Sequence, residues 1–321
     1  MGDGGGGGGG IGVGQDRERH PAEAQAPGPP GAEGTLPGAP GTGFPGEPPA
    51  LDWNQRWKAA AARRWERDGS HRRYWNRRAP SFGARSPDST YVRAFVEIMA
   101  PEPAWTVLDV GCGAGALAVP LAAKVRQVTA VDFCEGMIRQ LDQRIAALGL
   151  ANVRTLTAAW EDDWDRLGLG TYDAAIASRS LVVEDLAAAL VKLDRAARRR
   201  VLITSVVGDG PRDRRVLEAV GRVFRPGPDY IYVYNLLHQM GIYANVRLID
   251  ARREWTFARP AEAASFYEAY LEDLDPDERT RLDAYLAREL VLRDGRWALR
   301  HRDVVQWAVI WWDKPPDGPS R

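Results

Sequence analysis

The sequence predicts an α/β fold built on a doubly wound, mostly parallel sheet of the Rossmann-like kind. Short apolar runs alternate with helical patterns over residues 92–204, which is typical of successive βαβ units and therefore of parallel strands. The first run ends in an acid and continues directly into a glycine-rich loop, Val-Leu-Asp-Val-Gly-Cys-Gly-Ala-Gly, at residues 107–115. A strand that opens onto such a loop commonly leads into a helix that binds a nucleotide.

The expected strands follow from the positions of the apolar runs. Helical spacing of Met137, Ile138 and Leu141 predicts a helix between the second and third strands, and Gly149 should end it. Right-handed crossovers place the loops after the first four strands along one carboxyl edge, where open α/β sheets bind ligands. The first five strands are expected at residues 106–110, 127–132, 153–157, 173–177 and 201–205.

Beyond the fifth strand the pattern is less regular. Residues 246–255 and 304–312 are expected to be strands, and residues 260–292 are helical in pattern. The segment 230–243 carries an aromatic stripe that fits either the core or a wall of a binding pocket. The predicted organisation is a tail at 1–50, basic aromatic helices forming a lid at 51–90, and a main domain at 91–314 with helical insertions at 208–245 and 260–292.

The first fifty residues cannot contribute to a core. They hold 17 of the 33 glycines and 9 of the 22 prolines, so they bury too little apolar surface to offset the entropy of ordering and are expected to be disordered. Neither a secretory signal nor an apolar stretch of membrane-spanning length is recognisable, so a cytoplasmic protein without a membrane partner is expected. The four histidines and two cysteines lack metal-ligand spacing, so no metal is expected.

The formal net charge is zero, which provides no general attraction to nucleic acid. Locally, residues 56–78 hold nine basic side chains interleaved with aromatic ones, a pattern that could bind RNA. The same pattern fits a helical lid whose aromatic rings pack on the domain while its arginines stay in water. The neutral overall charge favours the lid and makes a nucleic-acid partner the weaker alternative.

Two acids accompany the glycine loop. Asp109 precedes the first glycine, and Asp132 closes the next strand, where a carboxylate can accept hydrogen bonds from both ribose hydroxyls. A helix is expected to begin near Ala114 and to present free N–H groups at its start. Glycine accepts positive φ and has no Cβ, so the loop can turn sharply and approach a ligand closely. The glycines concerned are Gly111, Gly113 and Gly115.

Asp109 discriminates between two classes of nucleotide cofactor. The spacing of Gly111, Gly113 and Ala116 also fits the dinucleotide fingerprint. A dinucleotide would bring its pyrophosphate close to Asp109, and at about 4 Å and an effective dielectric of 20 each like-charge contact costs on the order of 4 kcal/mol. S-adenosylmethionine carries an ammonium and a sulfonium instead, so the acid favours this cofactor over a nicotinamide dinucleotide.

At these positions the sequence resembles the class I S-adenosylmethionine-dependent methyltransferases. The matching stretches are VLDVGCGAGAL at 107–117, VTAVDFCEGM at 128–137 and YDAAIAS at 172–178. The resemblance implies the closing pair of strands with an antiparallel last strand, and S-adenosyl-L-methionine as cofactor. It assigns the methionine end to the glycine loop and the ribose to Asp132. The loop residues implied as cofactor ligands are Asp109, Gly111, Cys112, Gly113 and Gly115.

The same resemblance implies contacts to the rest of the cofactor. Phe133 and Met137 would pack on adenine, and Trp160 with Glu161 would hold its amino group. Ser178 and Arg179 fall where the family lines the donor methyl and the acceptor; the run Ala-Ser-Arg-Ser at 177–180 replaces the signature of enzymes that methylate exocyclic base nitrogens. The segment 74–82 resembles an entry helix that folds over the cofactor, from which two residues could reach the methionine carboxylate, Tyr74 and Arg78.

The sequence therefore predicts a cytoplasmic methyltransferase that acts on a small or medium-sized acceptor. The alternatives are an RNA methyltransferase, a non-catalytic protein that binds S-adenosylmethionine, and a nicotinamide-dependent oxidoreductase. No catalytic base is assigned, because none of the candidates near the expected mouth of the site has a diagnostic partner: His71, Tyr74, Tyr234 and His238. The acceptor, the methylated atom and the oligomeric state stay open.

Overall fold

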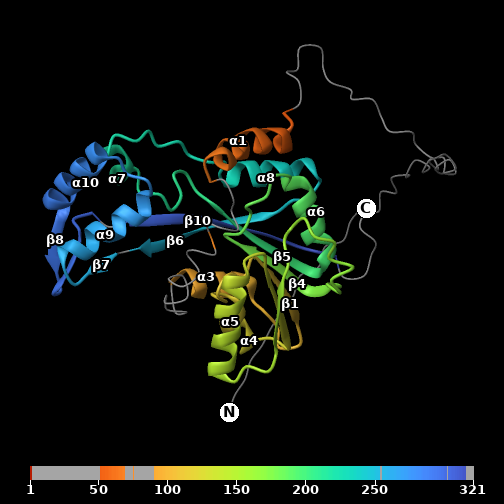
Figure 1. Cartoon of the computed structure of the whole chain (residues 1–321). Coiled ribbons are helices and arrows are strands. Elements are labelled where there is room, and N and C mark those ends of the chain that lie inside the picture. Colours follow the sequence, from red (N-terminus) through yellow and green to blue (C-terminus); the bar gives the residue numbers. More distant parts are fainter. Residues whose placement is uncertain (2–50, 69–74, 76–89, 254, 302, 316–321) are drawn as a thin grey trace, which may run out of the picture. The chain divides into compact units, whose positions relative to one another are not determined.

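The computed structural model describes residues 1, 51–68, 75, 90–253, 255–301 and 303–315 of the 321-residue chain. All described helices and strands belong to the unit Leu51–Arg321. This unit holds a large sheet with helices on both faces and a smaller sheet with its own helices (Figure 1). Apart from Met1, the predicted tail at 1–50 lies outside the described residues.

Seven strands form the large sheet. They are β1 (Thr106–Val110), β2 (Gln127–Asp132), β3 (Val153–Thr157), β4 (Tyr172–Ser178), β5 (Ala197–Val206), β6 (Asn245–Arg253) and β10 (Asp303–Asp313). Their order is β3-β2-β1-β4-β5-β10-β6. The first five strands pair in parallel, and β10 is antiparallel to both β5 and β6. The predicted Rossmann-like sheet with an antiparallel last strand is therefore confirmed.

The first three strands have the bounds that the sequence predicts, whereas β5 is longer. It begins at Ala197, opposite Tyr172 of β4, four residues before the predicted start. The extra residues include arginines whose charge does not prevent strand pairing, because Arg198 and Arg200 form ion pairs with Asp173 and Asp313. The apolar run thus marks only the buried part of the strand.

Nine described helices accompany the strands, and six of them cover the large sheet. They are α1 (Trp53–Asp68), α3 (Thr90–Met99), α4 (Ala118–Ala122), α5 (Glu135–Leu148), α6 (Leu186–Ala196), α7 (Arg214–Ala219), α8 (Tyr230–Gln239), α9 (Pro260–Leu271) and α10 (Pro276–Glu289). One buried cluster joins a face of the sheet to α3, α4 and α5, and another joins the opposite face to α1, α6 and α8. The strands supply alternate residues to the two clusters, as the pleat requires.

Two predicted helices have different bounds. The helix expected near Ala114 begins at Ala118, because residues 111–117 are used for turns, with the Gly115 N–H bonded to the Cys112 carbonyl at 3.0 Å. The single helical pattern at 260–292 is interrupted after Leu271, where Glu272 and Asp273 adopt positive φ, and Asp275 then caps α10. In contrast, α5 ends as predicted at Gly149, whose φ of 63° is the left-handed conformation that glycine favours.

The later part of the chain forms what we call the accessory module, made of α7, α9, α10 and three short strands. The strands are β7 (Thr256–Phe257), β8 (Leu290–Arg293) and β9 (Arg296–Leu299), so residues 290–292 are strand rather than helix. The module has its own core, in which Val216 of α7 contacts residues of α9, α10 and β9. The module thus buries apolar side chains of its own, separate from the two clusters on the large sheet.

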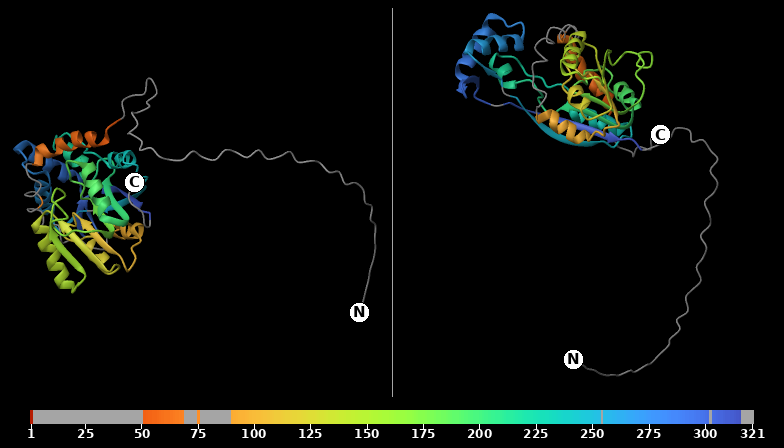
Figure 2. Two further views of the ribbon diagram at one scale, coloured as in Figure 1. Left: turned by 90° about the vertical axis from the view of Figure 1, so that its right-hand side faces the viewer. Right: turned by 90° about the horizontal axis from the view of Figure 1, so that it is seen from below.

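The accessory module lies beyond the carboxyl edge of the parallel strands. Trp307 pairs with Val206 at the end of β5, and residues 303–306 of β10 continue to pair with β6 past that point. Figure 2 shows these two long strands leading from the large sheet to the module. The helices α7, α9 and α10 are thus placed on the side of the sheet where the glycine loop opens.

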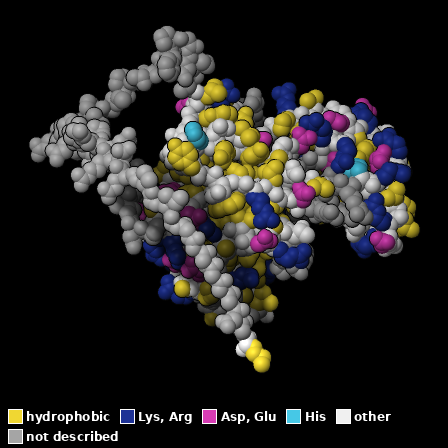
Figure 3. Space-filling view, turned by 180° about the vertical axis from the view of Figure 1, so that it is seen from behind, with side chains coloured by type: hydrophobic (Ala, Val, Ile, Leu, Met, Phe, Trp, Pro, Cys, Tyr) yellow, Lys and Arg dark blue, Asp and Glu magenta, His cyan; other side chains and the backbone are white. Residues whose placement is uncertain are grey.

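The described surface is mixed in charge. On the face drawn in Figure 3, basic and acidic side chains are interspersed. Within the described part of the chain, no helix combines the length and apolar character needed to cross a membrane.

Candidate functional site at the carboxyl edge of the sheet

The glycine loop is held against the neighbouring strand from its first residue. Val110 of β1 pairs with Val131 of β2, and the N–H groups of Gly111 and Cys112 both donate to the Val131 carbonyl, at 2.8 and 3.0 Å. These bonds turn the chain over the end of β2. The loop and the last residue of β2 are consequently brought to one place on the sheet edge.

Two glycines of the loop are required by the protein itself. Gly111 has φ of 70°, and a Cβ there would lie 2.3 Å from the Cβ of Ser180. Gly115 has φ of 82°, and its Cβ would lie 2.4 Å from Cδ1 of Leu141 in α5. From the sequence, the missing Cβ of these glycines is expected to let a ligand approach, whereas in the structure the space beside them is taken by Ser180 and Leu141.

Asp132 connects the end of β2 to the glycine loop. Its Oδ2 accepts the Gly113 N–H and its Oδ1 accepts the Cys134 N–H, both at 2.8 Å. The side chain is buried, and burial raises its pKa while the two backbone donors oppose that rise. Each carboxylate oxygen has a second acceptor position, so the pair of oxygens can still receive two hydroxyl donors.

Asp109 is buried beneath the same loop. Its Oδ2 has no hydrogen-bond partner among the described residues. Burial, with a further contribution from the charge of Asp132, raises the pKa of Asp109 to about 7. A cation bound nearby would favour the ionised carboxylate. An unpartnered buried carboxylate oxygen is thus available for a cationic ligand. The repulsion expected between Asp109 and the pyrophosphate of a dinucleotide acts at full strength only above that pKa, where the carboxylate is ionised.

A small apolar cluster lies beside Asp132. Ala114, Cys134 and Met137 are buried in it, and Phe133 and Trp75 pack against them. The structure therefore brings Phe133 and Met137 together, as the resemblance implies. It adds Trp75, which lies in the segment 74–82 that the resemblance places over the cofactor but which was not itself expected as a contact of Met137.

The two cysteines near the loop are buried thiols. Burial raises the pKa of both Cys112 and Cys134, and neither forms a disulfide. Raised pKa values keep the sulfur protonated and poorly nucleophilic. No cluster of potential metal ligands occurs among the residues that the structure describes.

The turns after β3 and β4 are joined by hydrogen bonds. Trp160 Nε1 donates to the Ser180 carbonyl at 3.1 Å, and Ser180 Oγ donates to the Val110 carbonyl at 2.6 Å. The Trp160 carbonyl accepts from Lys192 at 2.7 Å, and Glu161 is exposed. Ser180 was not singled out by the sequence analysis, although it links the end of β1 to the turn that carries Trp160.

Ser178 at the end of β4 belongs to a hydroxyl network. The Tyr91 hydroxyl lies 2.6 Å from Ser178 Oγ and 2.9 Å from Thr204 Oγ1. Tyr91 comes from α3 and Thr204 from β5, so the network joins three elements at the carboxyl edge. Neither Tyr91 nor Thr204 was predicted as a site residue, because only the fold brings them to Ser178.

The remaining candidates come from the predicted lid and from α8. Tyr74, Arg78 and His71 lie outside the described residues. His238 lies near the end of α8, shortly before β6 begins at Asn245, and Asn245 pairs with Trp311 toward the amino edge of the sheet. His238 forms an edge-on ring pair with Tyr243, with centroids 5.7 Å apart, and its position near the mouth of the site stays a prediction.

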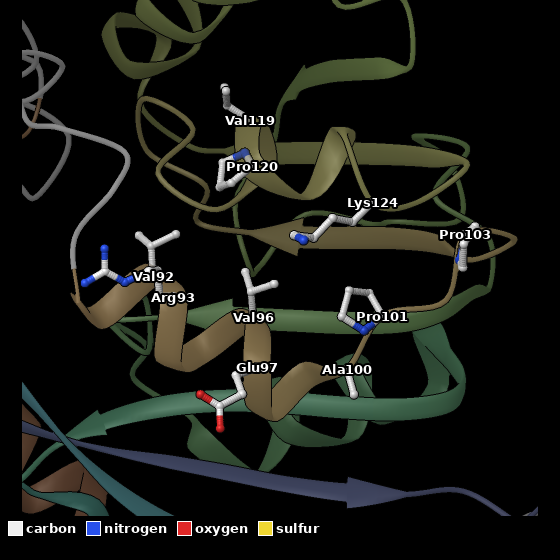
Figure 4. Close-up of a pocket in the computed structure, with 10 residues that line it drawn as sticks. All are labelled: Val92, Arg93, Val96, Glu97, Ala100, Pro101, Pro103, Val119, Pro120 and Lys124. Atoms are coloured by element: carbon white, nitrogen blue, oxygen red, sulfur yellow. The ribbon is translucent and has the colours of Figure 1, made fainter.

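A separate groove of about 800 Å³ lies between α3 and α4 (Figure 4). It is lined by apolar residues such as Val92, Val96 and Pro120, and by the charged side chains of Arg93, Glu97 and Lys124. None of the predicted cofactor residues lines it. The groove is therefore distinct from the glycine-loop site.

Comparison with known proteins supports the assignment of this site. A family model described as a methyltransferase domain matches residues 107–200, which include β1 to β4 and the glycine loop. The chain is 34% identical over 226 residues to an uncharacterised protein of Haemophilus influenzae, and this match covers 70% of the chain and 82% of that protein.

Shorter or more distant similarities also involve methyltransferases. A probable cobalt-precorrin-6B C(15)-methyltransferase of Methanocaldococcus jannaschii is 34% identical over 61 residues, covering 19% of this chain and 33% of that protein. Among solved structures, a SAM-dependent methyltransferase from Thiobacillus denitrificans in complex with S-adenosyl-L-homocysteine is 16% identical with a TM-score of 0.46. That match covers 74% of this chain and 97% of the other.

Proposed function

Because the chain belongs to the class I S-adenosylmethionine-dependent methyltransferases, we propose that it transfers the methyl group of S-adenosylmethionine to a small or medium-sized acceptor. The observation that supports a small or medium-sized acceptor is the packing of aromatic side chains at the ends of β4 and β5. There the buried rings of Tyr91 and Trp307 lie next to Ser178, with ring centroids 6.2 Å apart. The two rings are too buried to contact an acceptor themselves, but they form a rigid backing beside Ser178, which suits a small acceptor held in a fixed position.

We further propose which residues hold the cofactor. Asp132 binds the ribose, and the 111–115 loop with Asp109 and Cys112 surrounds the methionine end. The remaining assignments rest on the resemblance together with the positions described above. They put adenine against Phe133 and Met137, its amino group near Trp160 and Glu161, and the methyl group near Ser178. The methionine carboxylate is assigned to Tyr74 and Arg78 on the resemblance alone, because both lie outside the described residues.

The cofactor supplies an electrophilic methyl group on its sulfonium, so the protein mainly has to position the acceptor. Displacement in line with the carbon–sulfur bond requires the acceptor atom at about 3 to 3.5 Å from the methyl carbon. The network of Tyr91, Ser178 and Thr204 stiffens the edge where this must happen. The accessory module lies on the same side of the sheet and would bound the acceptor space from beyond the edge.

One relative supports a small organic acceptor. The Methanocaldococcus jannaschii protein, similar over 61 residues, is described as acting on cobalt-precorrin-6B.

The basic aromatic segment supports the view that RNA is not the acceptor. Trp57 is only 4% exposed, with Nε1 bonded to the Val183 carbonyl, and Lys58 forms an ion pair with Asp185. Trp57 is therefore not available to stack on bases, and the charge of Lys58 is already paired within the domain.

The proposal is tested by incubating the protein with methyl-labelled S-adenosylmethionine and a cell extract divided into small molecules, RNA and protein. Label in the small-molecule fraction alone is expected. Label in RNA or protein alone would overturn the acceptor class. Tight cofactor binding without transfer to any fraction would favour a non-catalytic binding protein instead. The Asp132→Asn variant, with weakened cofactor binding, serves as the control for label that is not transferred at this site.

A further inference from the structure

Arg179, which directly follows β4, is held in an unusual backbone conformation at the site. Its φ is 57°, in the left-handed region that is unfavourable for a residue with a Cβ. Its N–H donates to Thr204 Oγ1 at 2.8 Å, and the same oxygen bonds to the Tyr91 hydroxyl. Strained backbone of this kind persists where surrounding contacts determine it, and it is often found at functional sites.

The side chain of Arg179 is held as firmly as its backbone. The guanidinium carbon lies 4.4 Å from the ring centroid of Tyr91 and 5.7 Å from that of Trp307. Both rings are buried, at 2% and 7% exposure, so they form a rigid surface beneath the cation. Stacking on aromatic faces orients a guanidinium without using its N–H donors.

Those donors have no acceptor in the described part of the protein. No carboxylate there lies within ion-pair distance of Arg179, and no hydrogen bond is formed by its guanidinium. The arginines of the neighbouring strand β5 differ: Arg198, Arg199 and Arg200 each pair with a carboxylate. Arg179 is exposed, so its five donors face solvent at the sheet edge.

The direction of the side chain separates Arg179 from the cofactor residues. In the sheet, β2 with Asp132 lies on one side of β4, beyond β1, whereas β10 with Trp307 lies on the other side, beyond β5. The guanidinium extends toward Trp307 and thus away from the ribose acid. The next residue, Ser180, contacts Gly111, so Arg179 remains adjacent to the glycine loop.

We propose that Arg179 binds an anionic group of the methyl acceptor, a carboxylate or a phosphate, and so selects acidic acceptors. A planar guanidinium with free donors binds either group through two parallel hydrogen bonds, which orients the acceptor as well as attracting it. The aromatic rings beneath the cation place this anionic group next to Ser178 and the proposed position of the methyl group. This inference rests on the proposed function and adds the substrate class to it.

The test compares the wild type with Arg179→Met, Arg179→Lys and the control Arg247→Met, which removes an exposed arginine of β6 that pairs with Glu97. Benzoate and inorganic phosphate are titrated by calorimetry into protein saturated with S-adenosylhomocysteine. The wild type and the control should bind at least one probe, Arg179→Met at least tenfold more weakly, and Arg179→Lys in between. Affinity for S-adenosylhomocysteine should stay within twofold in all four proteins.

Turnover provides the second readout. Small molecules from a cell extract are separated by anion exchange, and label from S-adenosylmethionine should enter the retained, acidic fraction. Arg179→Met should raise KM for that fraction at least tenfold and leave kcat closer to the wild-type value. Neutral or cationic labelled products, failure of the wild type to bind either probe, or an equal loss of affinity for S-adenosylhomocysteine in Arg179→Met would overturn the inference. Arg179-dependent probe binding without any methylated product would instead overturn the proposed function, and the acceptor role with it.

Discussion

The Asp132 carboxylate accepts the Gly113 N–H at 2.8 Å, so the last residue of the second strand directly holds the loop that follows the first. The other oxygen accepts the Cys134 N–H, which orients the turn into α5. One side chain therefore shapes both loops that the resemblance assigns to the cofactor. A change at residue 132 should affect the geometry of the loop as well as any direct contact to ribose.

For Asp132→Asn we expect weaker cofactor binding and lower stability. An amide presents only one oxygen, so one of the two backbone N–H groups must face an NH2 group. Loss of a hydrogen bond to a charged group costs about 1.5–3 kcal/mol, which predicts a roughly tenfold to hundredfold increase in Kd for S-adenosylmethionine. Calorimetric titration measures the change. Asp142→Asn, on the exposed side of α5, is the matched control and should differ from wild type by less than about 0.5 kcal/mol; equal effects of the two variants would contradict the assignment.

Asp109 should make the ligand-free protein less stable as pH rises. Its pKa is about 7 in the folded protein against 3.8 for the ordinary side chain, so the folded state holds a proton that the unfolded state releases. The protonated carboxyl therefore contributes to the free energy of unfolding, in total on the order of 4 kcal/mol. This contribution is fully present below about pH 4 and is lost as the pH approaches and passes 7. Urea unfolding between pH 4.5 and 8 measures it. The Asp109→Asn variant should lack this part of the pH dependence.

The same carboxyl should make cofactor affinity increase as pH rises, whereas the stability of the ligand-free protein decreases. S-adenosylmethionine brings positive charge and favours the ionised form of Asp109, so binding below pH 7 must first remove the proton. Affinity should be about tenfold weaker at pH 6 than at pH 8. In Asp109→Asn it should be weaker throughout and nearly independent of pH over this range. A wild-type affinity that is unchanged between the two pH values would contradict the role of Asp109.

Gly111→Ala should disrupt the loop more than an equivalent change elsewhere. The new Cβ would lie 2.3 Å from the Cβ of Ser180, in addition to the strain of a φ of 70°. Gly149→Ala, with φ of 63° and no atom within 4 Å of its Cβ, isolates the strain, roughly 1–2 kcal/mol. Thermal unfolding should show a lower midpoint, and cofactor titration a weaker affinity, for Gly111→Ala than for this control. Adding Ser180→Gly should recover part of the loss, and no recovery would argue against this contact.

Asp213→Asn should destabilise the accessory module. Asp213 caps α7 through the Arg215 N–H at 3.0 Å, and its Oδ2 lies 3.0 Å from His301 Nε2. Burial alone would raise the pKa of Asp213, but the bond to His301 and the charge of Arg215 outweigh it, and the net pKa is lowered. The stabilisation should therefore be present above about pH 4 and disappear as pH falls through the lowered pKa.

We expect a loss of about 1–2 kcal/mol for this variant at pH 7, from the cap and the buried contact together. Denaturant unfolding at pH 7 and at pH 3 measures the difference. A loss of equal size at both pH values would contradict the electrostatic part of this explanation.

The sequence by itself determined the parts of the site that depend on neighbouring residues in the chain. The bounds of β1, β2 and β3, the positive φ of Gly111, Gly113 and Gly115, and the place of Asp132 at a strand end all follow from local periodicity and from the conformational freedom of glycine. The length of β5 and the break after Leu271 could not be read this way. There, ion pairs between β5 and its neighbouring strands, and the Asp275 cap of α10, overrode the apolar pattern.

Only the tertiary structure decided which distant residues complete the site. Ser180 lies against Gly111, Trp75 packs near Met137, and Arg179 lies over the rings of Tyr91 and Trp307. These contacts join residues that are 62 to 128 positions apart in the chain, and they depend on how the strands and helices are arranged around the sheet. Local sequence patterns report which face of a strand or helix is buried, but they carry no record of the neighbour that buries it.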